Sequence, residues 1–244
     1  MEGLAAAGSP ASKSSYAAGR LSPVTLFDDP ASWPEDDLIG ASIGMDPWAI
    51  VEAYSKGAFP MPLDGQLVGW YSPLRRGILP LDGLRVSRSL RKSAQRYRIT
   101  VDQAFPEVLE RCGDPRRPHG WINRDIVEMY TLLHAHEIAH SVEAWDAEGR
   151  LAGGLYGVSL GGLFAGESMF HDPRWGRDAS KAALIGLVAR LTRAGARGRL
   201  LDVQWRTDHL ASLGVIEVSR CDYLSRLRVA LQLSPPSWAE PEPA

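Results

Sequence analysis

The sequence predicts an α+β fold in a chain of 244 residues. Hydrophobic residues make up 45% of the chain and charged residues 23%, a balance that can bury a core. Apolar residues recur with a helical period in some segments and alternate in others. Their order, a hairpin-rich sheet followed by a helix, a strand and a second helix, is that of an α+β domain.

Composition divides the chain into four parts. Residues 1–22 are rich in Ala, Gly and Ser and are predicted to be a disordered tail, because they offer little apolar surface to offset the entropy of ordering. Residues 236–244 are rich in Pro and Glu, and the same is expected of them. A change from Pro-rich to regularly periodic sequence near residue 75 predicts a small N-terminal domain over residues 23–75 and a larger domain over residues 76–235.

The N-terminal domain is predicted to hold one helical region. Residues 36–54 are expected to be helical, because Ile50, Val51 and Tyr54 share a face and Gly57 is placed to end the helix. The Gly- and Pro-rich residues 58–77 are expected to form a loop with strand character over residues 67–71.

The larger domain alternates helices and strands. Helices are predicted over residues 89–95, 106–112, 125–136, 179–193 and 207–213, two of them ended by Gly195 and Gly214. Strands are predicted over residues 98–102 and 199–205, on both sides of a hairpin turn at residues 146–149, and after Gly161 and Gly162.

Charge and cysteine content exclude several classes of protein. A net charge of −2 argues against a protein that coats nucleic acid indiscriminately, although a local basic patch remains compatible with it. Cys112 and Cys221 stand alone, so neither a metal site nor a disulfide framework is predicted. The start lacks the pattern of an export signal and no apolar run is long enough to cross a bilayer. We therefore expect a cytoplasmic protein without membrane contact.

Two features are candidates for binding nucleic acid. Residues 85–98 hold six basic residues and no acidic one, and a helix would present Arg88, Arg91, Lys92 and Arg96 on one face toward phosphates. A solvated helix face is the alternative. Trp121 and Tyr130 can stack on unpaired bases, or can pack in the core as most such residues do.

Three polar residues are candidates for catalysis. Glu167 lies between small and apolar residues in GGLFAGESMF, where a buried carboxylate needs a partner. Asp202 and Gln204 are two apart on a predicted strand and would point to one face, where they can accept a proton from an amine and orient it. The alternative for Glu167 is an edge-strand residue that faces water, and for Asp202 and Gln204 it is a polar outer face of the sheet. His209 follows nearby, but a lone histidine is more often structural than catalytic.

The chain contains no GxSxG, phosphate-loop or GxGxxG pattern. Instead, an ordered series of motifs between about residues 20 and 230 resembles the leucyl/phenylalanyl-tRNA–protein transferase family. The motifs are GAFPM (57–61), WYSPLRRGILP (70–80), SRSLRK (87–92), HGWINRDIVEMY (119–130), AHSVEAW (139–145), GGLYGVSLGGLFAGESMF (153–170), DASKAAL (178–184), LLDVQW (200–205) and DHLASLGVIEVSRCDYL (208–224).

The resemblance implies a C-terminal domain of acetyltransferase-like (GNAT-type) fold and a leucyltransferase activity. Leucine or phenylalanine, and methionine less well, would pass from aminoacyl-tRNA to the α-amino group of proteins that begin with Arg or Lys. The product would carry an N-terminal degradation signal (N-end rule). No cofactor is required, since the ester is already activated, and a monomer is expected.

The resemblance also implies roles for individual residues. The positions that match the family's donor amino-acid pocket are Leu155, Phe164, Leu184, Leu187 and Leu201. Trp121, Tyr130 and Met61 match positions near the terminal adenosine, and Arg88, Arg91, Lys92 and Arg96 would hold tRNA phosphates. Glu167 would pair with the acceptor's positive charge, while Asp202, acting through Gln204, would orient the amine and take up charge.

Two positions depart from the family pattern. Met61 stands where the family usually has Trp, and Thr207 where it commonly has Asn. The alternatives to aminoacyl transfer from tRNA are an N-acyltransferase that uses acyl-CoA and a non-catalytic RNA-binding module. The stretch RWGRDASK fits a CoA pyrophosphate turn poorly.

Overall fold

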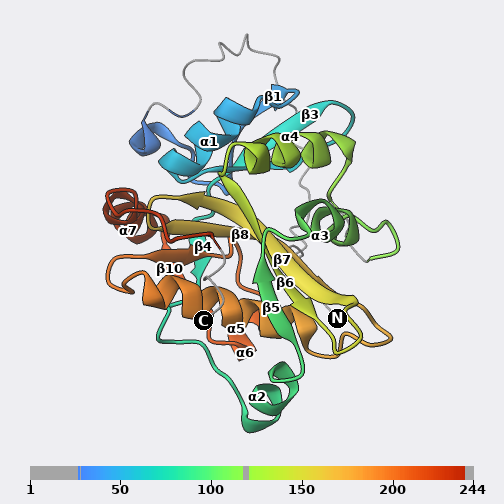
Figure 1. Ribbon diagram of the computed structural model, residues 1–244. Coiled ribbons are helices and arrows are strands. Elements are labelled where there is room, and N and C mark those ends of the chain that lie inside the picture. The colour runs from blue at the N-terminus through green and yellow to red at the C-terminus, as the bar shows by residue number, and fades with distance from the viewer. Residues whose placement is uncertain (1–26, 28, 118–120, 240–244) are drawn as a thin grey trace.

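The computed structural model describes residues 27, 29–117 and 121–239 (Figure 1). It contains two sheets: a three-stranded sheet of order β1-β3-β2 and a seven-stranded sheet of order β10-β4-β9-β8-β7-β6-β5. Residues 1–22, predicted to be disordered, lie outside the described residues. The mixture of helices and mainly antiparallel strands confirms the α+β class.

The three-stranded sheet is built by residues near the N-terminus. It contains β1 (Leu38–Ile43), β2 (Phe59–Pro62) and β3 (Leu67–Tyr71), with the 3-10 helix η1 (Pro30–Ser32) before them and α1 (Pro47–Lys56) between β1 and β2. All of its strand pairs are antiparallel. The strand predicted over residues 67–71 is confirmed.

The helix predicted over residues 36–54 is correct only in its second half. Residues 38–43 form β1, because pairing with β3 supplies their backbone partners. The helix α1 begins after Asp46, whose side chain accepts hydrogen bonds from the backbone N–H groups of Trp48 and Ala49. It ends at Gly57, which has the left-handed φ of 95° that a glycine adopts without strain.

The seven-stranded sheet carries most of the chain. Its strands are β4 (Arg75–Ile78), β5 (Arg98–Val101), β6 (Ala139–Trp145), β7 (Leu151–Leu160), β8 (Leu163–His171), β9 (Leu200–Asp202) and β10 (Ile216–Ser219). Only the β8–β9 pair is parallel, and α5 (Ala179–Arg193) makes the crossover that such a pair requires. The hairpin predicted at residues 146–149 joins β6 to β7.

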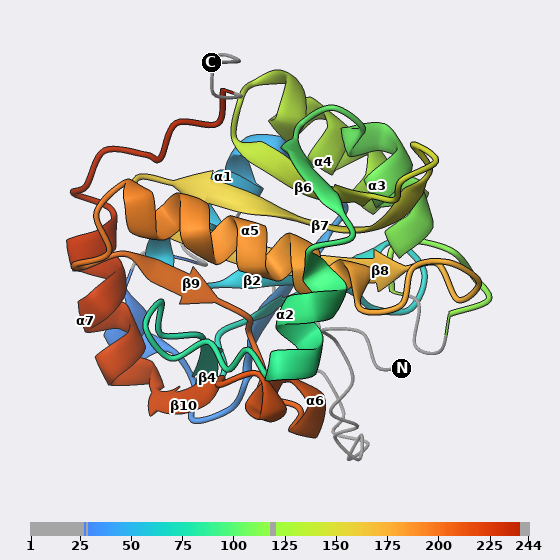
Figure 2. The same cartoon turned by 60° about the horizontal axis from the view of Figure 1, so that its bottom comes forward.

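Helices cover both faces of this sheet (Figure 1). The remaining helices are α2 (Arg88–Ala94), α3 (Phe105–Cys112), α4 (Arg124–Ala135), α6 (Asp208–Ser212) and α7 (Arg220–Ala230). One hydrophobic core lies between the sheet and α5, and a second joins the other face to α1, α3 and α4. Figure 2 shows α5 lying across its face of the sheet with α2 beside it. The loop expected over residues 58–77 is wrong at both ends, where β2 and β4 form, and the sequence did not predict β10 or α7.

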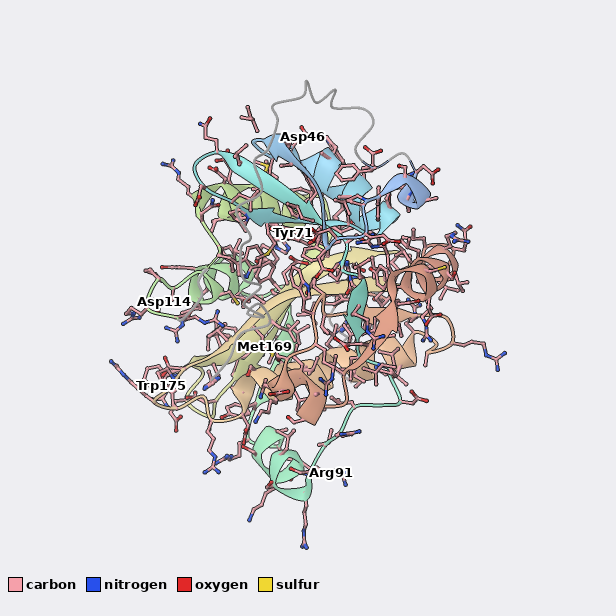
Figure 3. The ribbon with its side chains drawn as sticks, turned by 180° about the vertical axis from the view of Figure 1, so that it is seen from behind. Asp46, Tyr71, Arg91, Asp114, Met169 and Trp175 are labelled. Atoms are coloured by element: carbon pink, nitrogen blue, oxygen red, sulfur yellow. The ribbon has the colours of Figure 1, made fainter. Side chains whose placement is uncertain are left out.

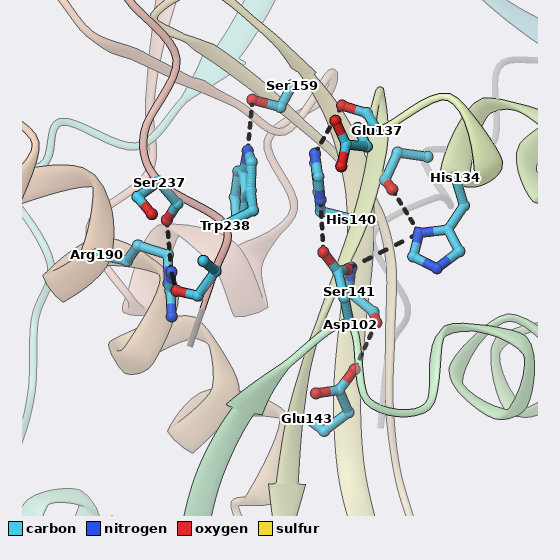
Figure 4. A network of polar contacts seen from close by, with 12 residues as sticks. Asp102, His134, Glu137, His140, Ser141, Glu143, Ser159, Arg190, Ser237 and Trp238 are labelled. Atoms are coloured by element: carbon cyan, nitrogen blue, oxygen red, sulfur yellow. Dashed lines mark hydrogen bonds and ion pairs between the residues drawn. The ribbon is translucent and has the colours of Figure 1, made fainter. Parts of the chain in front are cut away.

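The end of the described chain is packed, which corrects the prediction of a loose tail from residue 236. The Trp238 ring stacks on His140 with centroids 4.3 Å apart, and its indole N–H donates to Ser159 (Figure 4). Arg190 donates to the carbonyl of Ser237. Aromatic surface and these hydrogen bonds offset the entropy of ordering. Residues 240–244 lie outside the described residues.

Across the described part of the chain, no helix combines the length and apolar character needed to span a membrane.

Candidate active site

The center of the candidate site is the Asp202 carboxylate at the end of β9. Asp202 is completely buried, and its oxygens accept hydrogen bonds at 2.8 and 2.6 Å from Arg76 of β4. The Tyr223 hydroxyl of α7 donates at 2.9 Å, and the backbone N–H of Gln204 also donates at 2.9 Å. A carboxylate offers about four lone-pair positions, so these four hydrogen bonds saturate it.

Arg76 is held as firmly as its partner. Its guanidinium carbon lies 4.6 Å from the centroid of the Phe59 ring and 4.4 Å from that of Tyr223, and it donates to the Gly57 carbonyl. Burial lowers the pKa of Arg76, but the adjacent Asp202 carboxylate raises it, and the net result is above its usual value. A buried, bidentate ion pair of this kind has one geometry. Sequence reasoning missed Arg76 and Tyr223, although Arg76 stands in the WYSPLRRG motif next to a glycine.

Gln204 connects the two buried carboxylates. The strand predicted over residues 199–205 ends at Asp202, and Gln204 has a left-handed φ of 59°. Asp202 and Gln204 therefore do not share a strand face as predicted. Instead, the backbone N–H of Gln204 donates a hydrogen bond to the Asp202 carboxylate, while its side-chain Nε2 donates to Glu167 at 3.0 Å. A left-handed non-glycine residue costs about 1–3 kcal/mol and persists where surrounding contacts enforce it.

Close packing enforces that turn. The backbone of Gly77 donates to the Gln204 carbonyl at 2.8 Å and accepts from Val203 N–H at 3.0 Å. A Cβ at Gly77 would lie 2.8 Å from the carbonyl carbon of Trp205, so only glycine fits without a shift. The Trp205 indole N–H donates to Asp37 at 3.0 Å, which anchors the end of the turn to the N-terminal segment.

Glu167 of β8 is the second buried carboxylate, with 4% of its surface exposed. It accepts from Gln204 and, at 3.1 Å, from the Tyr130 hydroxyl. Burial raises the pKa of Glu167 to about 7; hydrogen bonds from Tyr54 and Tyr130 oppose this rise and the Asp202 charge adds to it. The carboxylate can therefore take up and release a proton near neutral pH.

Tyr130 does not fit the predicted role of stacking on a base. It is completely buried, its hydroxyl lies 2.8 Å from that of Tyr54, and its ring packs edge-on against Tyr156. A ring with no exposed surface leaves no face open to a base. Trp121 and Met61 are half-buried at the edge of the same hydrophobic core.

Four of the five predicted donor-pocket residues line one small apolar cavity. Leu155, Leu184, Leu187 and Leu201 do so, whereas the fifth, Phe164, is buried without lining it and packs against Trp238. The cavity has a volume of about 20 Å³. The other residues that line it are Leu79, Gly166, Met169, Val203, Leu210 and Val215. A space of this size holds about one water molecule, so a larger group enters only if side chains move.

The predicted basic face is partly a groove. Lys92 and Arg96 line a groove of about 720 Å³ between α2 and the start of α5, to which Arg85, Arg177 and Lys181 also contribute. Arg96 lies beyond the end of α2, and its guanidinium donates a hydrogen bond to the Ser93 hydroxyl. It therefore does not continue a basic stripe along the helix. Arg88 and Arg91 are exposed but do not line the groove. Figure 3 shows Arg91 on α2 at the edge of the molecule, with Met169 near the middle.

This arrangement combines buried proton-carrying groups, an adjoining apolar cavity and an exposed basic groove. It suits an enzyme that transfers an apolar acyl group from a large polyanionic carrier, since each substrate part meets matching chemistry.

Comparison with known proteins identifies the family. The sequence model of the family described as leucyl/phenylalanyl-tRNA protein transferase matches residues 78–228, and that of its N-terminal domain matches residues 45–74. The chain is 52% identical over 194 residues to the leucyl/phenylalanyl-tRNA--protein transferase of Rhizorhabdus wittichii, covering 77% of this chain and 75% of that protein. It is 46% identical over 193 residues to the enzyme of that name from Herpetosiphon aurantiacus, covering 78% and 96%. The chain therefore belongs to the leucyl/phenylalanyl-tRNA–protein transferase family and is an aminoacyltransferase.

A solved structure, that of L-PGS from Bacillus licheniformis, shares 11% identity and a TM-score of 0.36 over 65% of each chain. That TM-score supports no comparison of fold.

Proposed function

We propose that this protein transfers Leu or Phe, and Met less well, from leucyl-tRNA or phenylalanyl-tRNA to proteins that begin with Arg or Lys, creating a degradation signal at their N-terminus (N-end rule). The single observation that carries the proposal is the buried chain Asp202–Gln204–Glu167, which can hold an amine and its proton. The reaction is aminolysis of an ester that is already activated, so positioning supplies much of the acceleration.

The apolar cavity supports a donor side chain that is not branched at Cβ, such as that of Leu, Phe or Met. A pocket of this kind makes no hydrogen bonds, so it selects by shape, at about 1–3 kcal/mol per methylene group. Because the cavity is small, the donor must displace a lining side chain. Met169 is suited to this, since methionine is unbranched at Cβ and readily changes rotamer.

The basic groove supports binding of the tRNA backbone. Lys92 and Arg96 would contact phosphates from within the groove, and Arg88 and Arg91 from the exposed surface of α2. Such contacts add affinity without reading sequence. Trp121 and Met61 would lie against the terminal adenosine, with Met61 covering an apolar face where stacking is absent.

Glu167 supports an acceptor that carries positive charge. Arg76, the cation that acts on Glu167, is already paired with Asp202. An incoming ammonium group would therefore meet an uncompensated carboxylate, which favours a basic acceptor terminus.

We also propose the division into a small N-terminal domain over residues 23–75 and an acetyltransferase-like (GNAT-type) domain over residues 76–235. The parallel β8–β9 pair joined by α5, within an otherwise antiparallel sheet, supports this. The cytoplasmic location and the monomeric state stay predictions.

The test is transfer of labelled leucine from leucyl-tRNA to two peptides that differ only in their first residue, Arg or Ala. We expect transfer to the Arg peptide and little to the Ala peptide. Equal transfer to both would contradict the acceptor assignment. Transfer of acetyl from labelled acetyl-CoA, with none from leucyl-tRNA, would overturn the proposal as a whole.

A further inference from the structure

We infer that Glu167 accepts the proton of the attacking amine, and that Asp202, clamped by Arg76 and Tyr223, positions Gln204 instead of taking up the proton. The inference rests on the function proposed above and revises the roles predicted for both carboxylates. It depends on a geometric difference between them.

Asp202 has no position left for a proton. Its two oxygens accept two hydrogen bonds from Arg76, one from Tyr223 and one from the Gln204 backbone. None of its surface is exposed, so an acceptor amine cannot touch it. Protonation would break a charge-assisted pair inside the protein and leave Arg76 without its counter-ion.

Glu167 differs in each respect. It retains some exposed surface, and its hydrogen bonds come from neutral groups: the Gln204 amide and the hydroxyls of Tyr130 and of Tyr54 of α1, with no cation of the described residues paired to it. The other titratable or charged groups that act on it are Tyr156 of β7, Asp202 and Arg76. The pKa of Glu167, raised by burial to about 7, lies close to the value of about 7.7–8.0 of an α-amine. A proton can pass between groups of such similar pKa in either direction.

Gln204 is the positioning residue between the two carboxylates. Its backbone N–H is fixed by Asp202 and its side-chain Nε2 by Glu167. Its side-chain oxygen accepts no hydrogen bond from the described residues, so it can accept one from the acceptor amine. Arg76, Asp202 and Tyr223 act through this residue, because they hold its left-handed backbone in place.

The proton balance then closes within the site. The neutral amine attacks the ester carbonyl carbon, a C–N bond forms, and the nitrogen becomes positively charged. Its proton moves to the Glu167 carboxylate. The C–O bond to the ribose breaks, the ribose oxygen takes the proton from Glu167, and an amide and a free tRNA hydroxyl leave. Glu167 returns to its starting state, and no further reactant is needed.

The experiment is the pH dependence of kcat for leucine transfer to an Arg-starting peptide. The wild-type rate should fall below about pH 7 as Glu167 becomes protonated, since its carboxylate form is the acceptor. The assay is repeated with a second peptide whose terminal amine is replaced by a less basic hydrazine. The limb of the pH–rate profile that moves between the two peptides belongs to the acceptor amine, and the limb that does not move belongs to the enzyme.

Glu167→Gln should lower kcat by about 10²–10⁴-fold and remove the enzyme's own limb. Asp202→Asn should lower kcat but keep the limb, moved to lower pH, because the Asp202 charge that helps to raise the pKa of Glu167 is removed while Arg76 still lowers it. Tyr223→Phe keeps the ring on Arg76, and should lower kcat by about 2–10-fold without moving the limb, an estimate based on one lost hydrogen bond. Glu110→Gln on the exposed surface of α3 is the matched control and should behave as wild type.

The opposite pattern, in which Glu167→Gln keeps the limb and Asp202→Asn loses it, would overturn the inference. Thermal unfolding of each variant separates loss of fold from loss of chemistry, and Glu167→Asp, which keeps a carboxylate, should restore part of the limb. Absence of leucine transfer by the wild type would instead refute the proposed function.

Discussion

The buried polar site and the basic groove use charge in opposite ways. Arg76 and Asp202 are 1% and 0% exposed and meet in one fixed geometry, whereas Lys92 and Arg96 are exposed to water. Buried charges interact strongly and are costly to leave unpaired, while exposed charges are screened by salt over about 10 Å. We therefore expect substitutions in the buried site to change stability and kcat, and those in the groove to change tRNA affinity.

The largest effect is expected from Arg76→Met. This change leaves the Asp202 carboxylate buried without its counter-ion, and it should lower the free energy of unfolding by about 3–5 kcal/mol. Urea denaturation measures the loss. The double variant Arg76→Met with Asp202→Leu should recover part of it; a double variant as unstable as the single one would contradict the reasoning.

The second prediction concerns the stability of the buried site against pH. In the folded state the pKa of Glu167 is raised from 4.5 to about 7, so between these values the folded chain holds a proton that the unfolded chain has released. Stability should therefore fall as pH rises through this window, by up to about 3 kcal/mol. Urea midpoints at pH 5 and 7.5 test this, and Glu167→Gln should remove that part of the slope. An unchanged slope in Glu167→Gln would assign it to other groups.

A smaller effect should follow from changes in the groove. Lys92→Ala should weaken tRNA binding and reduce the slope of log K against log salt by about 1, with kcat unaltered. Arg228→Ala is the matched control, because both residues are exposed and lie in the last turn of their helices. If Lys92→Ala and Arg228→Ala give the same slope, the groove does not bind phosphate.

The smallest effect is expected at Thr207, which departs from the family's common Asn. The Thr207 side chain caps α6 by accepting the Leu210 backbone N–H at 3.2 Å. Since Asn caps helices about as well as Thr, Thr207→Asn should change stability by less than about 0.5 kcal/mol and leave transfer unaltered. Thermal unfolding and the transfer assay check this; a large loss of activity would show that Thr207 touches substrate.

Local patterns predicted most of the elements. Helix α5 has the predicted bounds, and β3, the β6–β7 hairpin and Gly57 at the end of α1 lie where expected. In each case the signal is short in range: apolar periodicity, a turn sequence or a glycine that stops a helix. The strand β1 was missed because its partner, β3, lies almost thirty residues further along the chain.

The sequence by itself determined the fold class, the family and the presence of Glu167, Asp202 and Gln204 in one protein. Only the tertiary structure decided what each carboxylate can do. Arg76 of β4 and Tyr223 of α7 are 126 and 21 residues away from Asp202 in the sequence, yet both contact it. Gln204 turns toward Glu167 only because Gly77 allows the close approach of the two backbones. Burial and hydrogen-bond partners set the behaviour of an ionisable group, and both come from contacts between distant segments.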